Sequence, residues 1–191
     1  RKDVKNRTRL CREEIEFVLA REDDCGVLMK QLEEGILPLR VTHNDTKLNN
    51  ILFDKNTGEG LCIIDLDTIM PGLAANDFGD SIRFGASTAE EDEKDLNKVH
   101  FDIELYRIYV KGYLEMAKDV LTPAENASLP WGARLMTLEC GMRFLADFLQ
   151  GDVYFKTTYP EHNLVRARTQ FRLVKEMEEQ FDQMQEIVET F

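Results

Sequence analysis

Cysteine, proline and tryptophan are scarce in this 191-residue sequence, which contains four, five and one of them, respectively. The four cysteines lie far apart and form no C-x-x-C pair, so we expect reduced, buried or half-buried thiols in a cytosolic protein. No apolar run approaches the roughly 20 residues of a membrane-spanning helix. The sequence starts at Arg1 within a polar, basic stretch, and we therefore expect no retained signal peptide and a chain cut from a longer protein.

Positive charge is also in short supply. Lys and Arg number 24 against 36 Asp and Glu, so the formal net charge is −12. Because phosphate groups attract Lys and Arg, this excess of acid disfavours general binding to nucleic acid or to an anionic membrane. Hydrophobic residues make up 43% of the chain, which indicates a folded core rather than intrinsic disorder.

Apolar residues at helical spacing predict helices in three parts of the chain. These parts are residues 8–34, residues 88–150 and residues 163–191. Thr88 and Thr122 each begin a capping-box pattern, which predicts a helix start at both positions. In residues 163–191 the apolar residues form a stripe that recurs at steps of three and four, as in a coiled-coil dimer. Because the run is short, a helix packed on the protein's own core is favoured.

Residues 36–85 have a different pattern, because short apolar runs alternate there with polar and turn-forming residues. The runs 50–53 and 61–64 are separated by a loop rich in turn formers, which predicts a β-hairpin. The stretch 70–72 is expected to break the chain, and a second loop is expected to extend to Asp80. The sequence therefore predicts a single α+β unit that is mostly α, with helices around a small β-hairpin.

Polar side chains gather where these short strands end. His43 and Asp45 follow a short extended stretch at residues 39–41, Asn50 begins the hairpin, and Asp65 and Asp67 come directly after its second strand. Loops held by strands are common places for catalytic groups. A lone carboxylate is costly to bury, so these acids are expected to face a cation, a hydrogen-bond donor or water.

This arrangement suits phosphoryl transfer. That reaction needs an Asp that orients the attacking hydroxyl and accepts its proton, and it needs oxygen ligands from an Asp and an Asn for Mg²⁺. Asp45 and Asn50 have the D-x-x-x-x-N spacing of a kinase catalytic loop. Asp65 follows the next hairpin strand, where a kinase places its metal-binding Asp.

Several sequence strings resemble a known family. The strings THNDTKLNNILFD, IIDLDTIMPG and DFGD are similar to the signature of the aminoglycoside phosphotransferase and choline kinase-like superfamily. The first two strings, with LMTLECGMRFL, resemble most closely the N-acetylhexosamine 1-kinase branch. Members of that branch use ATP to phosphorylate the anomeric hydroxyl of N-acetylglucosamine or N-acetylgalactosamine. The resemblance covers about residues 36–155 well and the flanking helices more loosely.

The resemblance implies roles for five residues. Asp45 would be the catalytic base, and Asn50 and Asp65 would hold Mg²⁺ for ATP as the phosphate donor. Arg143 and Tyr154 fall where the hexosamine branch contacts its sugar. For Arg143, an ion pair with an acid such as Glu139 is as good an interpretation as contact with a sugar.

Three more residues are expected to support the site. His43 would orient the loop by hydrogen bonding, and Asp80 would brace the catalytic loop without touching substrate. Asp67 is either a second acid around the metal or a solvated loop residue.

The nucleotide-binding N-terminal lobe of the family has no counterpart in the sequence, since no G-x-G-x-x-G precedes Asp45. The resemblance therefore implies that residues 1–191 are the C-terminal lobe of a kinase-like fold, the lobe that carries catalysis and acceptor binding. We expect this lobe alone to have little activity, and we expect the reaction to be cytoplasmic.

Other functions are compatible with parts of the pattern. Related folds phosphorylate aminoglycosides, choline and other alcohols, and fold does not fix the acceptor. Asp65 and Asp67 also resemble the acid pair of haloacid dehalogenase-like phosphatases, but Thr68 comes one residue early and the parallel strands are missing. A non-enzymatic helical module that forms a homodimer through residues 163–191 is a third possibility.

Overall fold

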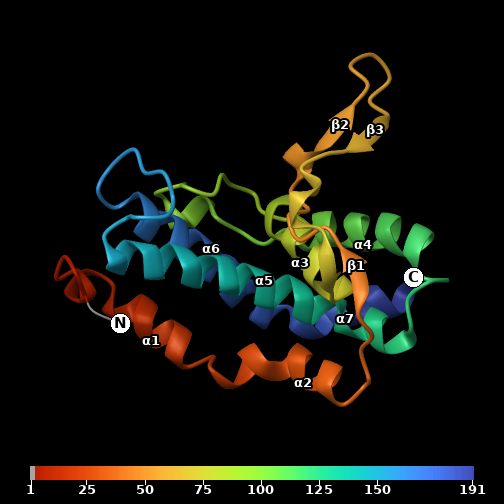
Figure 1. Cartoon of the computed structure of the whole chain (residues 1–191), viewed down its shortest axis with the longest axis horizontal. Coiled ribbons are helices and arrows are strands. Elements are labelled where there is room, and N and C mark those ends of the chain that lie inside the picture. Colours follow the sequence, from red (N-terminus) through yellow and green to blue (C-terminus); the bar gives the residue numbers. More distant parts are fainter. Residues whose placement is uncertain (1–2) are drawn as a thin grey trace.

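The computed structural model describes residues 3–191, which are arranged around one long helix, α5 (Pro123–Gln150). Helices α3 (Ala74–Gly85) and α6 (His162–Glu179) pack along α5, and the apolar core lies between them (Figure 1). The other α-helices of the described residues are α1 (Arg12–Leu19), α2 (Val27–Glu33), α4 (Ile103–Ala117) and α7 (Phe181–Thr190). Among the described helices, none is long and apolar enough to cross a membrane.

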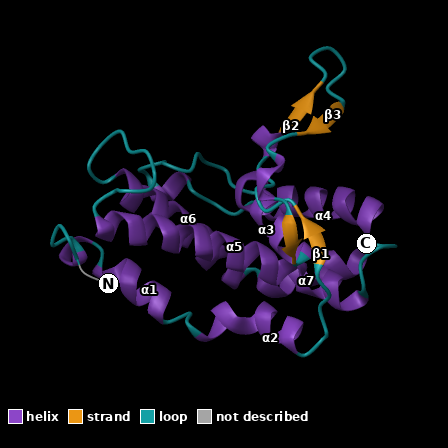
Figure 2. Cartoon of the chain, viewed as in Figure 1, coloured by secondary structure: helices purple, strands orange, loops and turns teal. Residues whose placement is uncertain are grey.

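Four short strands form two separate antiparallel pairs in the described residues. β1 (Arg40–Thr42) pairs with β4 (Met70–Gly72), and β2 (Ile51–Phe53) pairs with β3 (Gly60–Ile63). The predicted hairpin is confirmed, and Figure 2 shows it projecting away from the helices. The predicted α+β, mostly α fold class is also confirmed. The parallel strands that a haloacid dehalogenase-like phosphatase requires are absent from the described part of the chain.

Helices α3 and α5 meet backbone to backbone at two glycines. A Cβ atom on Gly79 would clash with the carbonyl group of Gly132, and a Cβ atom on Gly132 would clash with the carbonyl group of Ala75. Phe78, next to this contact, is 1% exposed. The close approach therefore holds α3 firmly in the core.

The structure corrects the prediction for residues 70–80, where a chain break and a loop were expected. Pro71 lies in β4 opposite Val41. In a two-stranded sheet every strand is an edge strand, so the missing N–H of proline is tolerated there. The following residues form α3 despite their Asn, Asp, Gly and Ser content, because one face of the helix is buried against α5 and packing outweighs weak helix propensity.

The single helix predicted over residues 8–34 is also corrected, because the structure has α1 and α2 with an irregular turn between them. Ion pairs hold this turn against the rest of the protein. The Arg21 guanidinium pairs with Glu178, and Asp24 pairs with Arg134. These contacts hold the turn against α6 and α5, whereas a continuous helix would direct the chain away from those two helices.

Two predicted helix boundaries are confirmed. Gly35 adopts φ of 75° after α2, and the N–H groups of Gly35 and Ile36 donate to the carbonyls of Leu32 and Gln31 as in a Schellman motif. Helix α5 begins with the predicted capping box at Thr122, and Pro123 occupies its first turn.

Removing this cap is expected to lower stability. In the Thr122→Ala variant the N–H of Glu125 loses the hydroxyl acceptor that lies 3.2 Å away. The free energy of unfolding, measured by urea denaturation, should fall by about 1 kcal/mol. Thr190→Ala, in the exposed last turn of α7, is the matched control and should change it by less than about 0.5 kcal/mol. Equal losses in the two variants would mean that the cap contributes nothing.

The predicted helix start at Thr88 is wrong. The Thr88 hydroxyl donates to the carbonyl of Lys98 and accepts from the N–H of His100, so it joins the two sides of an irregular loop. A bridge between Ser87 and Phe101 closes the same loop. The side chain that the sequence assigned to a helix cap is therefore used to fold the connection between α3 and α4.

The C-terminal stripe is covered by the chain itself. Residues 163–191 form α6 and α7 with a break at Gln180, where one helix was predicted. Val174, Met177 and Met184 are fully buried, and they belong to the core with α4 and α5. These residues leave no apolar face for a coiled-coil partner, so packing on the chain's own core accounts for the stripe.

The prediction of buried thiols holds for two of the four cysteines. Cys11 and Cys140 are buried, whereas Cys25 and Cys62 are exposed, and all four are free thiols. The prediction is wrong for Cys62 because it lies in β3, all of whose residues are exposed on the projecting hairpin.

Candidate active site

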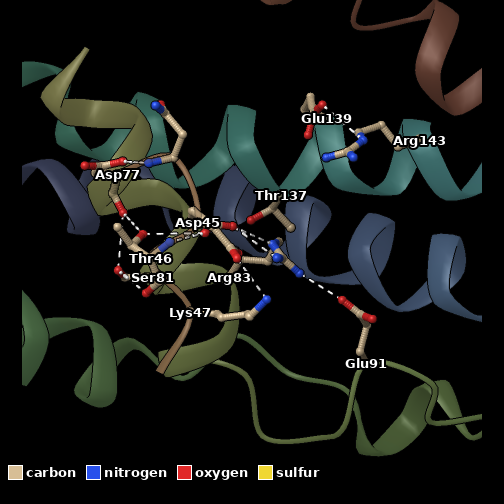
Figure 3. A network of polar contacts seen from close by, with 12 residues as sticks. Asp45, Thr46, Lys47, Asp77, Ser81, Arg83, Glu91, Thr137, Glu139 and Arg143 are labelled. Atoms are coloured by element: carbon tan, nitrogen blue, oxygen red, sulfur yellow. Dashed lines mark hydrogen bonds and ion pairs between the residues drawn. The ribbon is translucent and has the colours of Figure 1, made fainter. Parts of the chain in front are cut away.

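Helix α3 anchors the loop between β1 and β2 through two carboxylates. Asp77 accepts hydrogen bonds from the backbone N–H groups of His43 (2.7 Å) and Asn44 (2.8 Å). Asp80 accepts one from the N–H of Thr46 at 2.8 Å. Because residues three apart lie on the same face of a helix, both acids face the loop. Figure 3 shows Asp77 with Thr46 of the loop. Three backbone N–H groups of the loop are thus tied to a helix that is itself fixed in the core.

Hydroxyl groups add to this anchoring. The Thr46 hydroxyl donates to the Asp77 carbonyl at 2.5 Å, and the Ser81 hydroxyl lies 3.0 Å from the Thr46 carbonyl. On the opposite side, the Thr68 hydroxyl donates to the His43 carbonyl at 2.6 Å. The loop is therefore clamped between α3 and the segment that follows the hairpin.

Asp45 stands at the centre of the clamped loop. One of its carboxylate oxygens accepts hydrogen bonds from Lys47 Nζ and from Asn50 Nδ2, both at 2.9 Å. Burial acts to raise the pKa of Asp45, but these two hydrogen bonds and the charge of Lys47 outweigh burial and hold the pKa below its ordinary value. Asp45 is consequently ionised at neutral pH and can accept a proton.

The two predicted metal ligands lie at the same end of the hairpin, because Asn50 precedes β2 and Asp65 follows β3. The side chain of Asn50 is buried, and its backbone carbonyl accepts from the N–H of Ile64 at 2.9 Å. Asp65 follows Ile64 directly, so its backbone lies close to that of Asn50. The Asp65 side chain is exposed. Asp65 has φ of 64° in the left-handed region, which Asp tolerates better than most residues.

His43 connects the loop to this end of the hairpin. Its Nε2 atom lies 3.0 Å from the Ile64 carbonyl oxygen, and since a carbonyl only accepts, Nε2 carries the proton. Its Nδ1 atom is buried without a partner in the described residues. The histidine thus joins the end of β3 to the loop of Asp45, as a residue that orients the loop would.

Asp67 and Asp80 differ in their surroundings. Asp80 is 7% exposed and braces the loop through Thr46, whereas Asp67 is exposed and forms no side-chain hydrogen bond within the described residues. No group of three or more His, Cys, Asp or Glu side chains in the described residues is arranged to hold a metal ion. Any metal bound at Asn50 and Asp65 would need further oxygen ligands from a substrate or water.

A cavity of about 470 Å³ opens beside Asp45. Asp45, Lys47 and Asn50 line one side of it, and Tyr109 and Tyr113 of α4 line another. Burial raises the pKa of Tyr113 to about 12, so its phenol is neutral and can donate a hydrogen bond. The cavity is a place where a small molecule can approach the Asp45 carboxylate.

Arg143 and Tyr154 lie together, but away from this cavity. The Arg143 guanidinium carbon is 5.7 Å from the centroid of the Tyr154 ring, and Arg143 Nε is 3.7 Å from a Glu139 carboxylate oxygen. Both the ion pair and the aromatic contact are therefore present. Among the described residues that line the cavity, neither Arg143 nor Tyr154 is found.

Asp77, Thr46 and Ser81 were not predicted as site residues, although they hold the loop. Asp77 and Asp80 are three residues apart, a spacing that places both acids on one helix face. That signal is readable only when residues 74–85 are recognised as a helix. The wrong prediction of a loop there concealed it.

The sequence of the chain is similar to a known protein family. A sequence profile of the phosphotransferase enzyme family (APH) matches residues 2–118. This range is more than half of the chain, and it includes the loop of Asp45, the hairpin, Asp65 and helix α3. The chain therefore belongs to the phosphotransferase enzyme family.

Proposed function

We propose that this protein transfers the terminal phosphoryl group of ATP to a hydroxyl of a small molecule, with Asp45 as the catalytic base. The observation that carries the proposal is the state of Asp45, an ionised carboxylate in a clamped loop at the edge of a cavity. In this reaction Asp45 accepts the proton of the acceptor hydroxyl. The acceptor oxygen then bonds to phosphorus as the bond between phosphorus and the ADP oxygen breaks.

Asn50 and Asp65 are proposed to hold Mg²⁺. The Asn50 amide nitrogen donates to Asp45, so its amide oxygen is directed elsewhere and is free of hydrogen bonds within the described residues. The Asp65 carboxylate is exposed, and the preceding residue, Ile64, is hydrogen-bonded through its N–H to the Asn50 carbonyl. Carboxylate and amide oxygens suit Mg²⁺, which is commonly held by one or two protein oxygens together with phosphates and water. When bound, Mg²⁺ would neutralise the charge of the phosphate groups.

We also propose that residues 1–191 form a C-terminal lobe and that a nucleotide-binding lobe covers the hairpin. Exposed large apolar patches mark interaction sites in soluble proteins. The apolar side chains exposed on and beside the hairpin are Leu48, Leu52, Phe53, Leu61, Ile63 and Leu66. We expect the isolated lobe to have little activity, and we place the reaction in the cytoplasm, where ATP is available.

The proposed acceptor is an N-acetylhexosamine phosphorylated at its anomeric hydroxyl. Its support is the similarity of three sequence strings to that branch. Arg143 and Tyr154, which that similarity assigns to sugar binding, do not line the cavity beside Asp45 among the described residues, so their pairing adds no support.

The test is an acceptor panel with the full-length protein. ADP release is measured with Mg²⁺ and ATP in the presence of N-acetylglucosamine, N-acetylgalactosamine, choline, or an aminoglycoside, and without acceptor. We expect release to rise at least about tenfold with the N-acetylhexosamines and to remain at background with the others. A response only to choline or the aminoglycoside would refute the acceptor assignment, and no response to any acceptor would count against the proposed function.

A further inference from the structure

The carboxylate of Asp80 serves two partners at once. One oxygen accepts from the N–H of Thr46 at 2.8 Å, and the other lies 3.0 Å from a terminal guanidinium nitrogen of Arg83. Arg83 is one turn further along α3. The position of the Asp80 carboxylate, and therefore of the loop backbone, depends on this arginine as well as on its own helix.

Arg83 is a buried cation placed between two acids. Its side chain is 9% exposed, and its second terminal nitrogen donates to Glu91 at 2.9 Å. Glu91 lies in the loop between α3 and α4, as Figure 3 shows, and belongs to a different part of the chain from Asp80. A buried guanidinium requires paired acids, so loss of either acid disturbs the geometry of the other.

Glu91 extends the chain of contacts to α6. Its other carboxylate oxygen is 3.7 Å from Arg166 Nε, and its backbone carbonyl accepts from the Thr169 hydroxyl at 2.6 Å. The contacts therefore run without interruption from α6 through Glu91, Arg83 and Asp80 to the Thr46 amide.

We propose that Arg83 is a positioning residue that couples the loop of residues 86–102 to the loop of Asp45. Within the described residues Arg83 forms no hydrogen bond or ion pair with Asp45, and it acts through Asp80. The guanidinium is suited to this task because its planar fork bonds two carboxylates at once, which a lysine ammonium on a flexible stem does less well. The catalytic consequence of this coupling rests on the proposed function, whereas the coupling itself does not.

Hydrogen–deuterium exchange in the full-length protein tests the coupling. Glu91→Gln weakens only the contact between Glu91 and Arg83. Arg83→Gln weakens the contacts of Arg83 with both Glu91 and Asp80. We expect backbone amides in residues 43–50 to exchange at least about fivefold faster in both variants, because opening of the loop becomes easier. Arg134→Gln is the matched control, since Arg134 is 10% exposed and also pairs with two acids, Asp24 and Glu178.

The control should speed exchange near Asp24 and leave residues 43–50 unchanged. If Glu91→Gln leaves the exchange of residues 43–50 at the wild-type rate, the coupling is refuted, even if Arg83→Gln fails to fold. Equal acceleration of that loop in Arg134→Gln would also refute it, since the effect would then be general destabilisation.

Kinetics separate positioning from a merely structural role. Arg83→Gln should lower kcat about tenfold with the KM for ATP within about twofold, because a displaced base affects the chemical step more than nucleotide binding. Arg83→Lys should recover only part of this loss, and Arg134→Gln should keep the wild-type kcat. Unchanged kcat in Arg83→Gln would refute the catalytic part. If the wild type itself transfers no phosphate, the proposed function fails, while the exchange data still decide the coupling.

Discussion

Replacing Asp45 with Asn should reduce kcat about 1000-fold while the melting temperature stays within about 3 °C of the wild type. The amide has nearly the shape of the carboxylate and can keep a contact with Asn50 or Lys47 through its oxygen. It cannot accept a proton from the acceptor hydroxyl. The loop is held through its backbone by Asp77 and Asp80, so its position does not depend on the charge of Asp45.

The measurements are steady-state kinetics and thermal unfolding of the full-length protein. Asp119→Asn is the matched control, because Asp119 is exposed between α4 and α5 and lies outside the site. The control should keep both kcat and melting temperature. An Asp45→Asn enzyme with more than about a tenth of the wild-type kcat would show that Asp45 is not the base. A loss of folding would show that Asp45 is structural.

Replacing Gly132 with Ala should cause one of the largest losses of stability available from a single methyl group. The added Cβ would overlap the carbonyl group of Ala75, which is backbone and cannot rotate away. Overpacking of this kind costs about 3 kcal/mol, which corresponds to roughly a 10 °C fall in melting temperature for a domain of this size. Because α3 would have to move, Asp77 and Asp80 would move with it, and kcat should fall as well.

The matched control for this change is Gly112→Ala in α4. A Cβ at Gly112 meets no atom within 4 Å, so only helix propensity changes. This variant should be more stable than the wild type by up to about 1 kcal/mol, as measured by chemical denaturation. If Gly132→Ala is as stable as the wild type, the backbone contact between α3 and α5 is not as close as described.

The elements that could be predicted from sequence are those whose signals are local. The hairpin has apolar runs on both sides of a turn-rich loop, and α5 has a capping box followed by proline. Helix α3 lacks such a signal, because its residues have weak helix propensity and its stability comes from packing on α5. Its two anchoring acids, Asp77 and Asp80, were consequently not both recognised.

Helix interruptions were missed for a related reason. The turn after α1 is held by the pair between Arg21 and Glu178, which are 157 residues apart. No local pattern reports such a contact. The candidate site was also only partly predictable from sequence. The spacing of Asp45, Asn50 and Asp65 was evident in the sequence. The contacts of Arg83 with two acids and the cavity beside α4 depend on the tertiary structure.

The most direct test of the account is a crystal structure of the full-length protein with Mg²⁺, a non-hydrolysable ATP analogue and N-acetylglucosamine. We expect Mg²⁺ at about 2.1 Å from oxygens of Asn50 and Asp65. We also expect the sugar hydroxyl within hydrogen-bonding distance, about 3 Å, of the Asp45 carboxylate. A metal ion bound by other residues, or an acceptor hydroxyl far from Asp45, would contradict it.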